Sequence, residues 1–218
     1  MGKTAIILGS TGLTGGILLE KLLEDVRYSE IKVFNRNSVG KSHPRLKEYI
    51  VDLIQFDTFA PNFKADEVFC CIGTTLKKTP DKELYRRIDY GIPVEAAKTA
   101  KANIVSKFLV MSSMGANPNS SVFYNKTKGE MERDVLAQNI ENTYVLQPSL
   151  IGGKRDEKRT GEYIGKLFMS IINPLLFGPL KKYQSIKPET IANAMLFLAN
   201  SEEPSGRYES DQLKTFGN

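Results

Sequence analysis

The amino-terminal stretch, residues 3–23, constrains the fold of this chain more than any other segment. Thr4–Leu8 is an apolar run of strand length with no polar side, which is typical of a strand buried on both faces of a parallel sheet. Glycines follow at positions 9, 12 and 15, and the residues after them repeat apolar side chains at helical spacing. A strand, a glycine-rich turn and a helix start predict an anion site, because bare backbone N–H groups and the positive end of the helix dipole face one point.

Ordinary loops also collect glycine, so an unspecialised turn between strand and helix is the alternative. Here the glycines directly follow a buried strand and open an amphipathic helix, which favours a nucleotide-binding turn. Glycine permits a tight turn, close approach of a pyrophosphate, and close packing of the helix on the strand.

The rest of the chain alternates strand-like and helix-like segments. Apolar runs of strand length occur at 31–35, 48–51, 68–72, 108–111 and 143–146. Amphipathic helical patterns occupy about 81–101, the residues from 124 onward, and 188–200. The positions of the first of these helices expected to face the sheet are Leu84, Ile88, Ile92 and Ala96. Pro93 is expected to interrupt that helix. The alternation predicts an α/β fold, a doubly wound parallel sheet of the Rossmann type.

The length of 218 residues suits a single domain, residues 1–218, with a full core. Regularity fails from Gly152, so residues about 150–186 are predicted to form a small carboxyl-terminal extension on the substrate side. Within it, Leu167–Leu180 is mostly apolar but carries two prolines, which makes it too short and too broken to span a membrane. A pocket wall, a dimer contact and contact with a membrane surface are the alternatives for this segment, and a homodimer is possible.

Charge and composition limit the classes of molecule that this protein is expected to bind. The net charge is +5, and the basic residues occur in short scattered groups, which argues against nucleic acid as a partner but is compatible with a phosphorylated ligand. Neither a signal peptide nor an apolar run of spanning length is visible, so a cytoplasmic location is expected. Cys70 and Cys71 are adjacent and poorly placed to form a disulfide, and the single histidine, His43, has no neighbouring ligands. No metal site is predicted.

Asn35 and Arg36 end the predicted second strand and bear on cofactor choice. Position 35 lies 20 residues beyond Gly15, where an NAD site would place a carboxylate to hold the ribose 2′-hydroxyl. A guanidinium suits the 2′-phosphate of NADP, and no carboxylate repels that phosphate. The pair therefore favours NADP(H), with a solvated arginine at a strand end as the alternative.

Two further strand ends are candidate cofactor contacts. Asp52 and Leu53 follow the third predicted strand, at a position where such folds often meet the adenine. The fourth strand ends in the small residues Gly73, Thr74 and Thr75, which leave room for the central part of a cofactor, since ligands bind along the carboxyl edge of a parallel sheet.

Tyr124 and Lys128 are the candidate catalytic pair. They are four residues apart and so share one face of a helix. A phenol ionises near pH ~10 in water, but a neighbouring ammonium favours the phenolate, which would make Tyr124 an acid–base catalyst. Lys128 is also long enough to reach the hydroxyls of a nicotinamide ribose. A surface tyrosine and lysine on a helix is the plainer alternative.

Ser113 is the candidate for polarising a substrate carbonyl, because it lies at the end of the fifth strand, 11 residues before Tyr124. Ser112 is the rival. Side chains alternate across a strand, so only one of the two is expected to point toward the cofactor, and we favour Ser113.

These motifs, in this order, resemble the short-chain dehydrogenase/reductase superfamily. Asn35-Arg36, Cys71-Ile-Gly-Thr-Thr75 and Asp89-Tyr-Gly91 resemble more narrowly an atypical subgroup typified by the HIV Tat-interactive protein oxidoreductase. The resemblance spans about residues 3–200. It implies a Rossmann domain, NADP(H), a tyrosine acid–base and a lysine helper. By position, it implies as cofactor-binding residues Gly9, Thr11, Gly12, Leu13, Thr14, Gly15, Arg36, Ile72, Gly73, Tyr124 and Lys128.

The resemblance also marks departures and rival functions. Many relatives place asparagine in the helix before strand five, where this chain has Asp89. The function expected is NADP(H)-dependent transfer of hydride to or from a carbonyl or alcohol, with a small molecule as substrate. The rivals are a non-catalytic NADPH-binding redox sensor or regulator, and an epimerase or dehydratase that keeps its cofactor through turnover.

Overall fold

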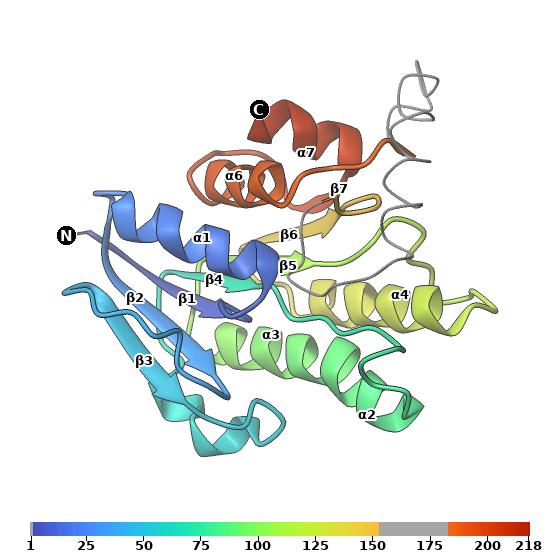
Figure 1. The fold of residues 1–218 in the computed structure, drawn as a ribbon, viewed down its shortest axis with the longest axis horizontal. Coiled ribbons are helices and arrows are strands. Elements are labelled where there is room, and N and C mark those ends of the chain that lie inside the picture. The colour runs from blue at the N-terminus through green and yellow to red at the C-terminus, as the bar shows by residue number, and fades with distance from the viewer. Residues whose placement is uncertain (1, 153–182) are drawn as a thin grey trace.

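Seven parallel strands form one sheet in the order β3-β2-β1-β4-β5-β6-β7 (Figure 1). The computed structural model describes residues 2–152 and 183–218. Its strands are β1 (Lys3–Leu8), β2 (Tyr28–Asn35), β3 (Leu46–Ile50), β4 (Glu67–Cys70), β5 (Lys107–Met111), β6 (Asn142–Gln147) and β7 (Gly206–Glu209). The predicted doubly wound parallel sheet is confirmed. The order reverses direction between β1 and β4, and in such sheets ligands bind at that point, outside the carboxyl ends of the strands.

Helices cover both faces of the sheet. On one face lie α1 (Leu13–Glu24), α6 (Pro188–Ala199) and α7 (Ser210–Gly217) (Figure 1). On the other lie α2 (Lys82–Arg86), the π-helical turn η3 (Arg87–Gly91), α3 (Ile92–Ala102), α4 (Phe123–Leu136) and two 3₁₀ turns, η1 (Phe56–Thr58) and η2 (Ala60–Asn62). Alternate residues of β1 enter opposite cores: Ala5 and Ile7 face α1 and α6, whereas Ile6 and Leu8 face α3. A strand buried on both faces needs the continuous apolar run seen in the sequence.

The segment at 81–101 differs from its prediction in one respect. Leu84 is exposed, and Tyr85 and Asp89 are buried in its place. The π-helical turn explains the change, because one extra residue per turn shifts the face that is presented to the sheet. The turn lies just before Pro93, whose missing N–H is tolerated at the start of α3. Ile92 and Ala96 are buried as predicted.

Two elements near the carboxyl terminus were not predicted. β7 adds a four-residue edge strand beside β6, and α7 packs beside α6. β7 is too short for a clear periodic signal. The start of α7 is fixed by a reciprocal capping box between Glu209 and Gln212, with glutamate where serine or threonine is the usual signal.

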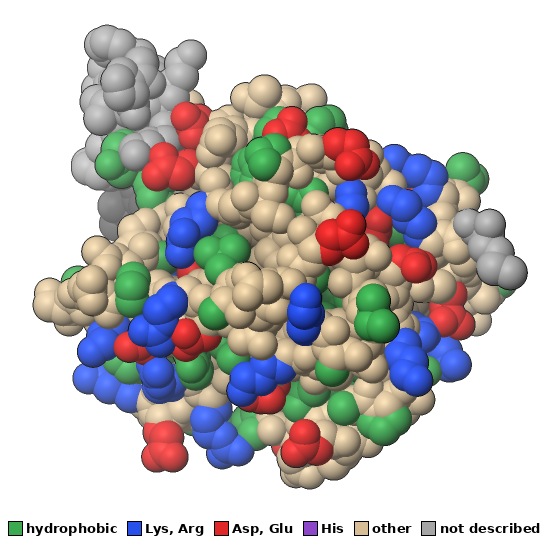
Figure 2. Space-filling view, turned by 180° about the vertical axis from the view of Figure 1, so that it is seen from behind, with side chains coloured by type: hydrophobic (Ala, Val, Ile, Leu, Met, Phe, Trp, Pro, Cys, Tyr) green, Lys and Arg blue, Asp and Glu red, His purple; other side chains and the backbone are tan. Residues whose placement is uncertain are grey.

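The predicted substrate-side region, 150–186, falls largely outside the described residues, and so does Leu167–Leu180. Its two ends are described, and they meet: Ile151 and Ile186 form an isolated parallel bridge. None of the described helices has the length and apolar character needed to cross a membrane. On the face shown in Figure 2, basic side chains are interspersed with acidic ones.

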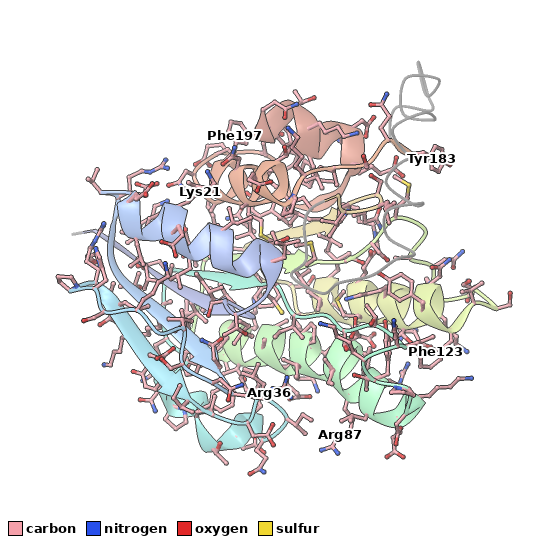
Figure 3. All side chains as sticks on the ribbon, viewed as in Figure 1. Lys21, Arg36, Arg87, Phe123, Tyr183 and Phe197 are labelled. Carbon is pink, nitrogen blue, oxygen red and sulfur yellow. The ribbon has the colours of Figure 1, made fainter. Side chains whose placement is uncertain are left out.

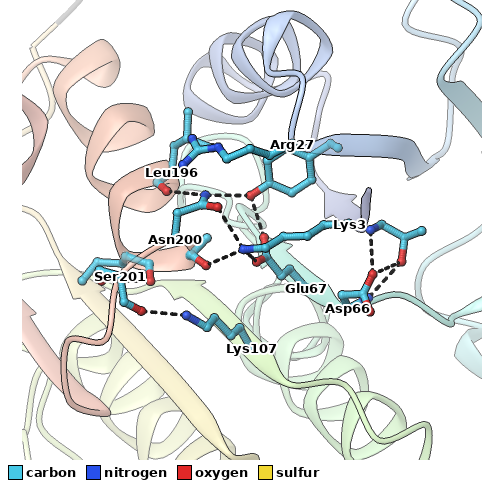
Figure 4. Close-up of polar contacts among 12 residues, drawn as sticks. Lys3, Arg27, Asp66, Glu67, Lys107, Leu196, Asn200 and Ser201 are labelled. Atoms are coloured by element: carbon cyan, nitrogen blue, oxygen red, sulfur yellow. Dashed lines mark hydrogen bonds and ion pairs between the residues drawn. The ribbon is translucent and has the colours of Figure 1, made fainter. Parts of the chain in front are cut away.

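At the amino ends of the strands, a partly buried polar network ties β1, β2 and β4 to the end of α6 (Figure 4). The carboxylate of Glu67 accepts hydrogen bonds from Lys3 (2.7 Å) and from the hydroxyl of Tyr28 (2.6 Å). Asn200 accepts from Lys3 at 2.9 Å and donates to Tyr28 at 3.0 Å. Burial and the charge of Glu67 raise the pKa of Tyr28, which keeps its hydroxyl a donor. The polar groups of this network therefore satisfy one another.

The glycine turn brings α1 against β1. Gly9 has a φ of +86°, which L side chains rarely adopt. A Cβ on Gly15 would lie 2.2 Å from the carbonyl oxygen of Gly9. The two residues therefore leave no room for a side chain, and the start of α1 sits directly on the carboxyl end of β1.

We expect Gly15→Ala to lower the melting temperature by about 4–10 °C, because the methyl group must push the turn open at a cost of roughly 1–3 kcal/mol. Calorimetry or circular dichroism measures this shift. Gly206→Ala is the control: an added Cβ there meets nothing within 4 Å, so a change below about 2 °C is expected. Equal, small effects of both substitutions would contradict the close packing.

Candidate active site

A cavity of about 490 Å³ opens at the carboxyl edge of the sheet. It is lined by the glycine turn, the loop after β4, and the facing helices α2, η3 and α4. The predicted site residues that line it are Gly12, Leu13, Thr14, Gly15, Ile72, Gly73, Tyr124 and Lys128. The fold thus brings the predicted phosphate turn and the predicted catalytic pair to one cavity, although more than 100 residues separate them in the chain.

The start of α1 presents unpaired amides. Gly12 N–H bonds the carbonyl of Gly9 at 3.0 Å, and the first helical bond runs from Gly16 to Gly12 at 2.8 Å. No side chain in the described part of the chain caps the helix, and its first turn holds no acidic residue. The N–H groups of Leu13, Thr14 and Gly15 therefore have no intrahelical acceptor, and they coincide with the positive end of the helix dipole. An anion fits this arrangement, with the exposed Thr11 at its edge.

Asn35 reaches toward the same turn. Its side chain is 3% exposed, and its Oδ1 accepts a hydrogen bond from the hydroxyl of Ser10 at 2.9 Å. Its Nδ2 has no partner among the described residues. Arg36, the next residue, is exposed just beyond the end of β2 (Figure 3). A donor amide and a cation thus stand where an NAD site would have a carboxylate.

Asp52 and Leu53 are not brought to this cavity. Asp52 accepts a hydrogen bond from the backbone of Ile54 at 3.0 Å, and Leu53 is 7% exposed within the core on the α3 face. Their proposed contact with adenine stays a prediction.

The two serines at the end of β5 differ in their partners. The hydroxyl of Ser112 donates to Glu132 at 2.5 Å, and Glu132 also accepts from Gln147 and Arg207. This buried network fixes α4 against β5, β6 and β7. The hydroxyl of Ser113 is buried and has no partner among the described residues. Ser112 lines the cavity, whereas Ser113 does not. The hydroxyl of Ser113 is therefore available for a hydrogen bond but does not face the cavity directly.

Lys128 forms a buried ion pair with Asp89. The Nζ–Oδ1 distance is 3.0 Å, and the side chains are 4% and 0% exposed. The other carboxylate oxygen of Asp89 accepts from the backbone N–H of Thr74 at 2.7 Å. A Cβ on Gly73 would lie 3.6 Å from Asp89 and 3.8 Å from the ammonium. The ion pair therefore sits directly beneath the loop that follows β4.

The ion pair keeps Lys128 charged. Burial by itself would lower the pKa of Lys128, but the charge and hydrogen bond of Asp89, together with Tyr124 and Cys70, outweigh it. The pKa of Lys128 consequently lies above its usual value. Besides Asp89, the ammonium has one long contact of 3.5 Å to the carbonyl of Met111, so it retains donor capacity for a ligand hydroxyl.

Sequence reasoning left Tyr85 and Asp89 out of the predicted site. Tyr85 is 0% exposed, lines the cavity, and packs edge-to-face against Phe123 at 5.4 Å between ring centroids. The two residues lie four apart on one face of the helical segment, a spacing that is readable in the sequence, but the pattern of apolar residues pointed to Leu84 and Ile88 instead. Among the described residues, no group of three or more metal-ligating side chains occurs.

Comparison with known proteins gives relatives and a fold. No protein-family model matches the chain. Protein HTATIP2 of Rattus norvegicus is 31% identical over 170 residues, covering 76% of this chain and 70% of that protein. Protein FMP52, mitochondrial, of Debaryomyces hansenii is 30% identical over 222 residues, covering 98% and 94%.

Solved structures agree on the fold. The Bordetella bronchiseptica enzyme WbmH in complex with NAD+ aligns with a TM-score of 0.73 at 15% identity, covering 95% of this chain and 75% of that one. A UDP-N-acetylglucosamine 4-epimerase from Methanobrevibacter ruminantium aligns with a TM-score of 0.71 at 18% identity, covering 98% and 80%.

The expected cytoplasmic location is wrong. FMP52 relatives from several fungi carry the word mitochondrial in their names. The expectation rested on the lack of a recognisable secretory leader and on unpaired cysteines, and these features separate secreted proteins from others without distinguishing the cytosol from an organelle.

We expect Asp89→Asn to destabilise the protein by about 3 kcal/mol at pH 7, because it leaves a buried ammonium unpaired. Without Asp89, burial holds the pKa of Lys128 below that of the unfolded chain. The unfolded state then binds more protons, and stability rises with pH toward about 10. In the unmutated protein the raised pKa of Lys128 contributes to the free energy of unfolding, and this contribution is fully present below about pH 10. Urea denaturation at pH 7, 8, 9 and 10 measures both profiles.

Lys128→Met in the Asp89→Asn background is the control. It removes the unpaired ammonium, so it should recover part of the stability and abolish the rise with pH. A deficit of Asp89→Asn that stays constant from pH 7 to 10 would argue against the ion pair as its cause.

Proposed function

The chain belongs to the family of the HTATIP2 and FMP52 proteins, an atypical group of short-chain dehydrogenases/reductases, and on this premise we propose that it is an NADP(H)-dependent oxidoreductase. It transfers hydride to or from a carbonyl or alcohol of a small molecule, with Tyr124 as the acid–base group. The observation that carries the proposal is the single cavity that joins the uncapped start of α1 to Tyr124 and Lys128.

The residues present fit a dinucleotide. Free N–H groups of Leu13, Thr14 and Gly15 suit a pyrophosphate, and Gly9 and Gly15 let the backbone approach it. Ile72 and Gly73 line the next part of the cavity. Solved neighbours such as WbmH are complexes with NAD, which supports a nicotinamide dinucleotide for this fold.

Asn35 and Arg36 support NADP(H) over NAD(H). A buried amide nitrogen without a partner is costly, and an acceptor oxygen on the adenosine ribose or its phosphate would satisfy it. Arg36 is exposed, and its guanidinium can form charge-assisted hydrogen bonds with a 2′-phosphate.

The catalytic roles follow from the side chains. The cofactor supplies or accepts the hydride at its nicotinamide ring. Tyr124 donates its phenolic proton to the substrate oxygen in reduction and takes it back in oxidation. Lys128, held charged by Asp89, stabilises the phenolate and donates to the ribose hydroxyls. Ser113 keeps the proposed role of donor to the substrate oxygen because its hydroxyl is uncommitted, although it lies behind the cavity wall; Ser112, which lines the cavity, is held by Glu132.

Residues about 150–186 form the substrate side of the single domain in this proposal. Ile151, at the start of this region, lines the cavity and bridges to Ile186 at its end.

We expect Arg36→Ala to raise the Kd for NADPH about tenfold while leaving the Kd for NADH within about twofold, because only NADPH carries the 2′-phosphate. Asn35→Asp should act in the same direction, since it adds a negative charge beside that phosphate. Titration calorimetry or nicotinamide fluorescence measures both constants.

Arg27→Ala is the matched control, an exposed arginine at the amino end of the same strand that pairs with Asp25. It should leave both constants unchanged. Equal weakening of NADPH and NADH by Arg36→Ala would remove the case for NADP specificity.

We expect Tyr124→Phe to lower kcat for carbonyl reduction by at least about 100-fold, because the proton donor is lost. The Kd for NADPH should change by less than about threefold, since the phenol is not its main anchor. The measurement is NADPH oxidation with a panel of aldehydes, ketones and quinones. Turnover that survives the substitution would refute the acid–base role of Tyr124.

The same set of carbonyl compounds distinguishes the proposed function from its two alternatives. Tight NADPH binding without oxidation by any carbonyl compound would favour a redox-sensing or regulatory protein. NADP(H) that copurifies and stays bound through turnover would favour an epimerase or dehydratase.

A further inference from the structure

Tyr85 is a second phenol that lines the cavity. The side chain is 0% exposed, and its hydroxyl finds no hydrogen-bond partner among the described residues. Buried hydroxyls are almost always paired, because an unpaired one loses its bonds to water without replacement. A phenylalanine would keep the edge-to-face contact with Phe123 and avoid this cost.

The hydroxyl of Tyr85 is poised as a donor. Burial raises its pKa, and the neighbouring carboxylate of Asp89, through its charge and its polar approach to the hydroxyl, raises it further, with a contribution from Tyr124. It therefore stays protonated through the neutral range and can donate to an acceptor oxygen.

The position of Tyr85 favours contact with the substrate rather than with the phosphates of a cofactor. Tyr85 lies on α2, and its ring contacts Phe123 at the start of α4, next to Tyr124. The glycine turn at the start of α1 lines the same cavity from the helix layer on the opposite face of the sheet (Figure 1). The two phenols thus flank the same end of the cavity.

We propose that Tyr85 binds the substrate: its hydroxyl donates a hydrogen bond to an oxygen of the molecule that Tyr124 acts on. The substrate class is then an oxygen-bearing compound with an acceptor at the reacting carbonyl or beside it. This assignment rests on the proposed function, which supplies the cofactor complex, and adds a residue that determines substrate affinity.

The experiment compares Tyr85→Phe with the unmutated protein in complex with NADP+ and 4-nitrobenzaldehyde. NADP+ carries no hydride to transfer, so the aldehyde binds without reacting and calorimetry gives its Kd directly. Tyr85→Phe should weaken the aldehyde about tenfold and leave the Kd for NADP+ unchanged. Its melting temperature should stay equal or rise, because no partner of the hydroxyl is lost.

Tyr90→Phe is the control. Tyr90 belongs to the adjoining π-helical turn, and its hydroxyl donates to Asp134 at 2.8 Å. This variant should lose stability and keep its affinity for the aldehyde. Equal aldehyde affinity in Tyr85→Phe and the unmutated protein, or no aldehyde binding by the unmutated NADP+ complex, would overturn the role of Tyr85.

Two other results would also overturn the substrate role of Tyr85, and the experiment distinguishes between them. A weaker Kd for NADP+ in Tyr85→Phe would assign the hydroxyl to the cofactor instead. No NADP+ binding by the unmutated protein would refute the proposed function itself and, with it, the substrate role.

Discussion

The contact between Gly15 and the carbonyl of Gly9 is the constraint on which the site depends. A Cβ at Gly15 would stand 2.2 Å from that oxygen, so only glycine lets α1 begin directly on the end of β1. That closeness places three free amides and the helix dipole at the reversal point of the strand order. Moved outward by a side chain, α1 would still cover the sheet, but its amides would no longer face the cavity.

The Asp89–Lys128 ion pair joins the two halves of the cavity. Asp89 holds the backbone of Thr74 after β4 with one oxygen and the ammonium on α4 with the other. A buried pair of charges rarely adds net stability over apolar side chains. Its benefit here is positional: it fixes a charged lysine beneath Gly73, close to Tyr124, without exposing the charge to water. The π-helical turn is what points Asp89 inward.

Local pattern was enough to predict the sheet and not enough to predict the contacts around the site. The apolar run of β1, the glycine turn and the Tyr124–Lys128 spacing each carry their signal within a few residues. The π-helical turn changes the buried face through a hydrogen-bond shift that residue types do not reveal, so Leu84 was assigned inward wrongly. β7 is stabilised by its neighbour β6 rather than by its own sequence.

The two ends of the sheet differ in how far their buried polar groups are paired. At the amino ends, Glu67, Tyr28, Lys3 and Asn200 satisfy one another. At the carboxyl edge, the polar atoms without partners in the described part of the chain include Asn35 Nδ2, Tyr85 Oη and Ser113 Oγ, whereas Thr143 Oγ1 is such an atom near the amino end of β6. Each unpaired group costs roughly 1–3 kcal/mol, and folding alone gives no reason to gather them at one edge. Ligand binding gives such a reason, because a polar molecule bound at that edge forms the hydrogen bonds that folding left unmade.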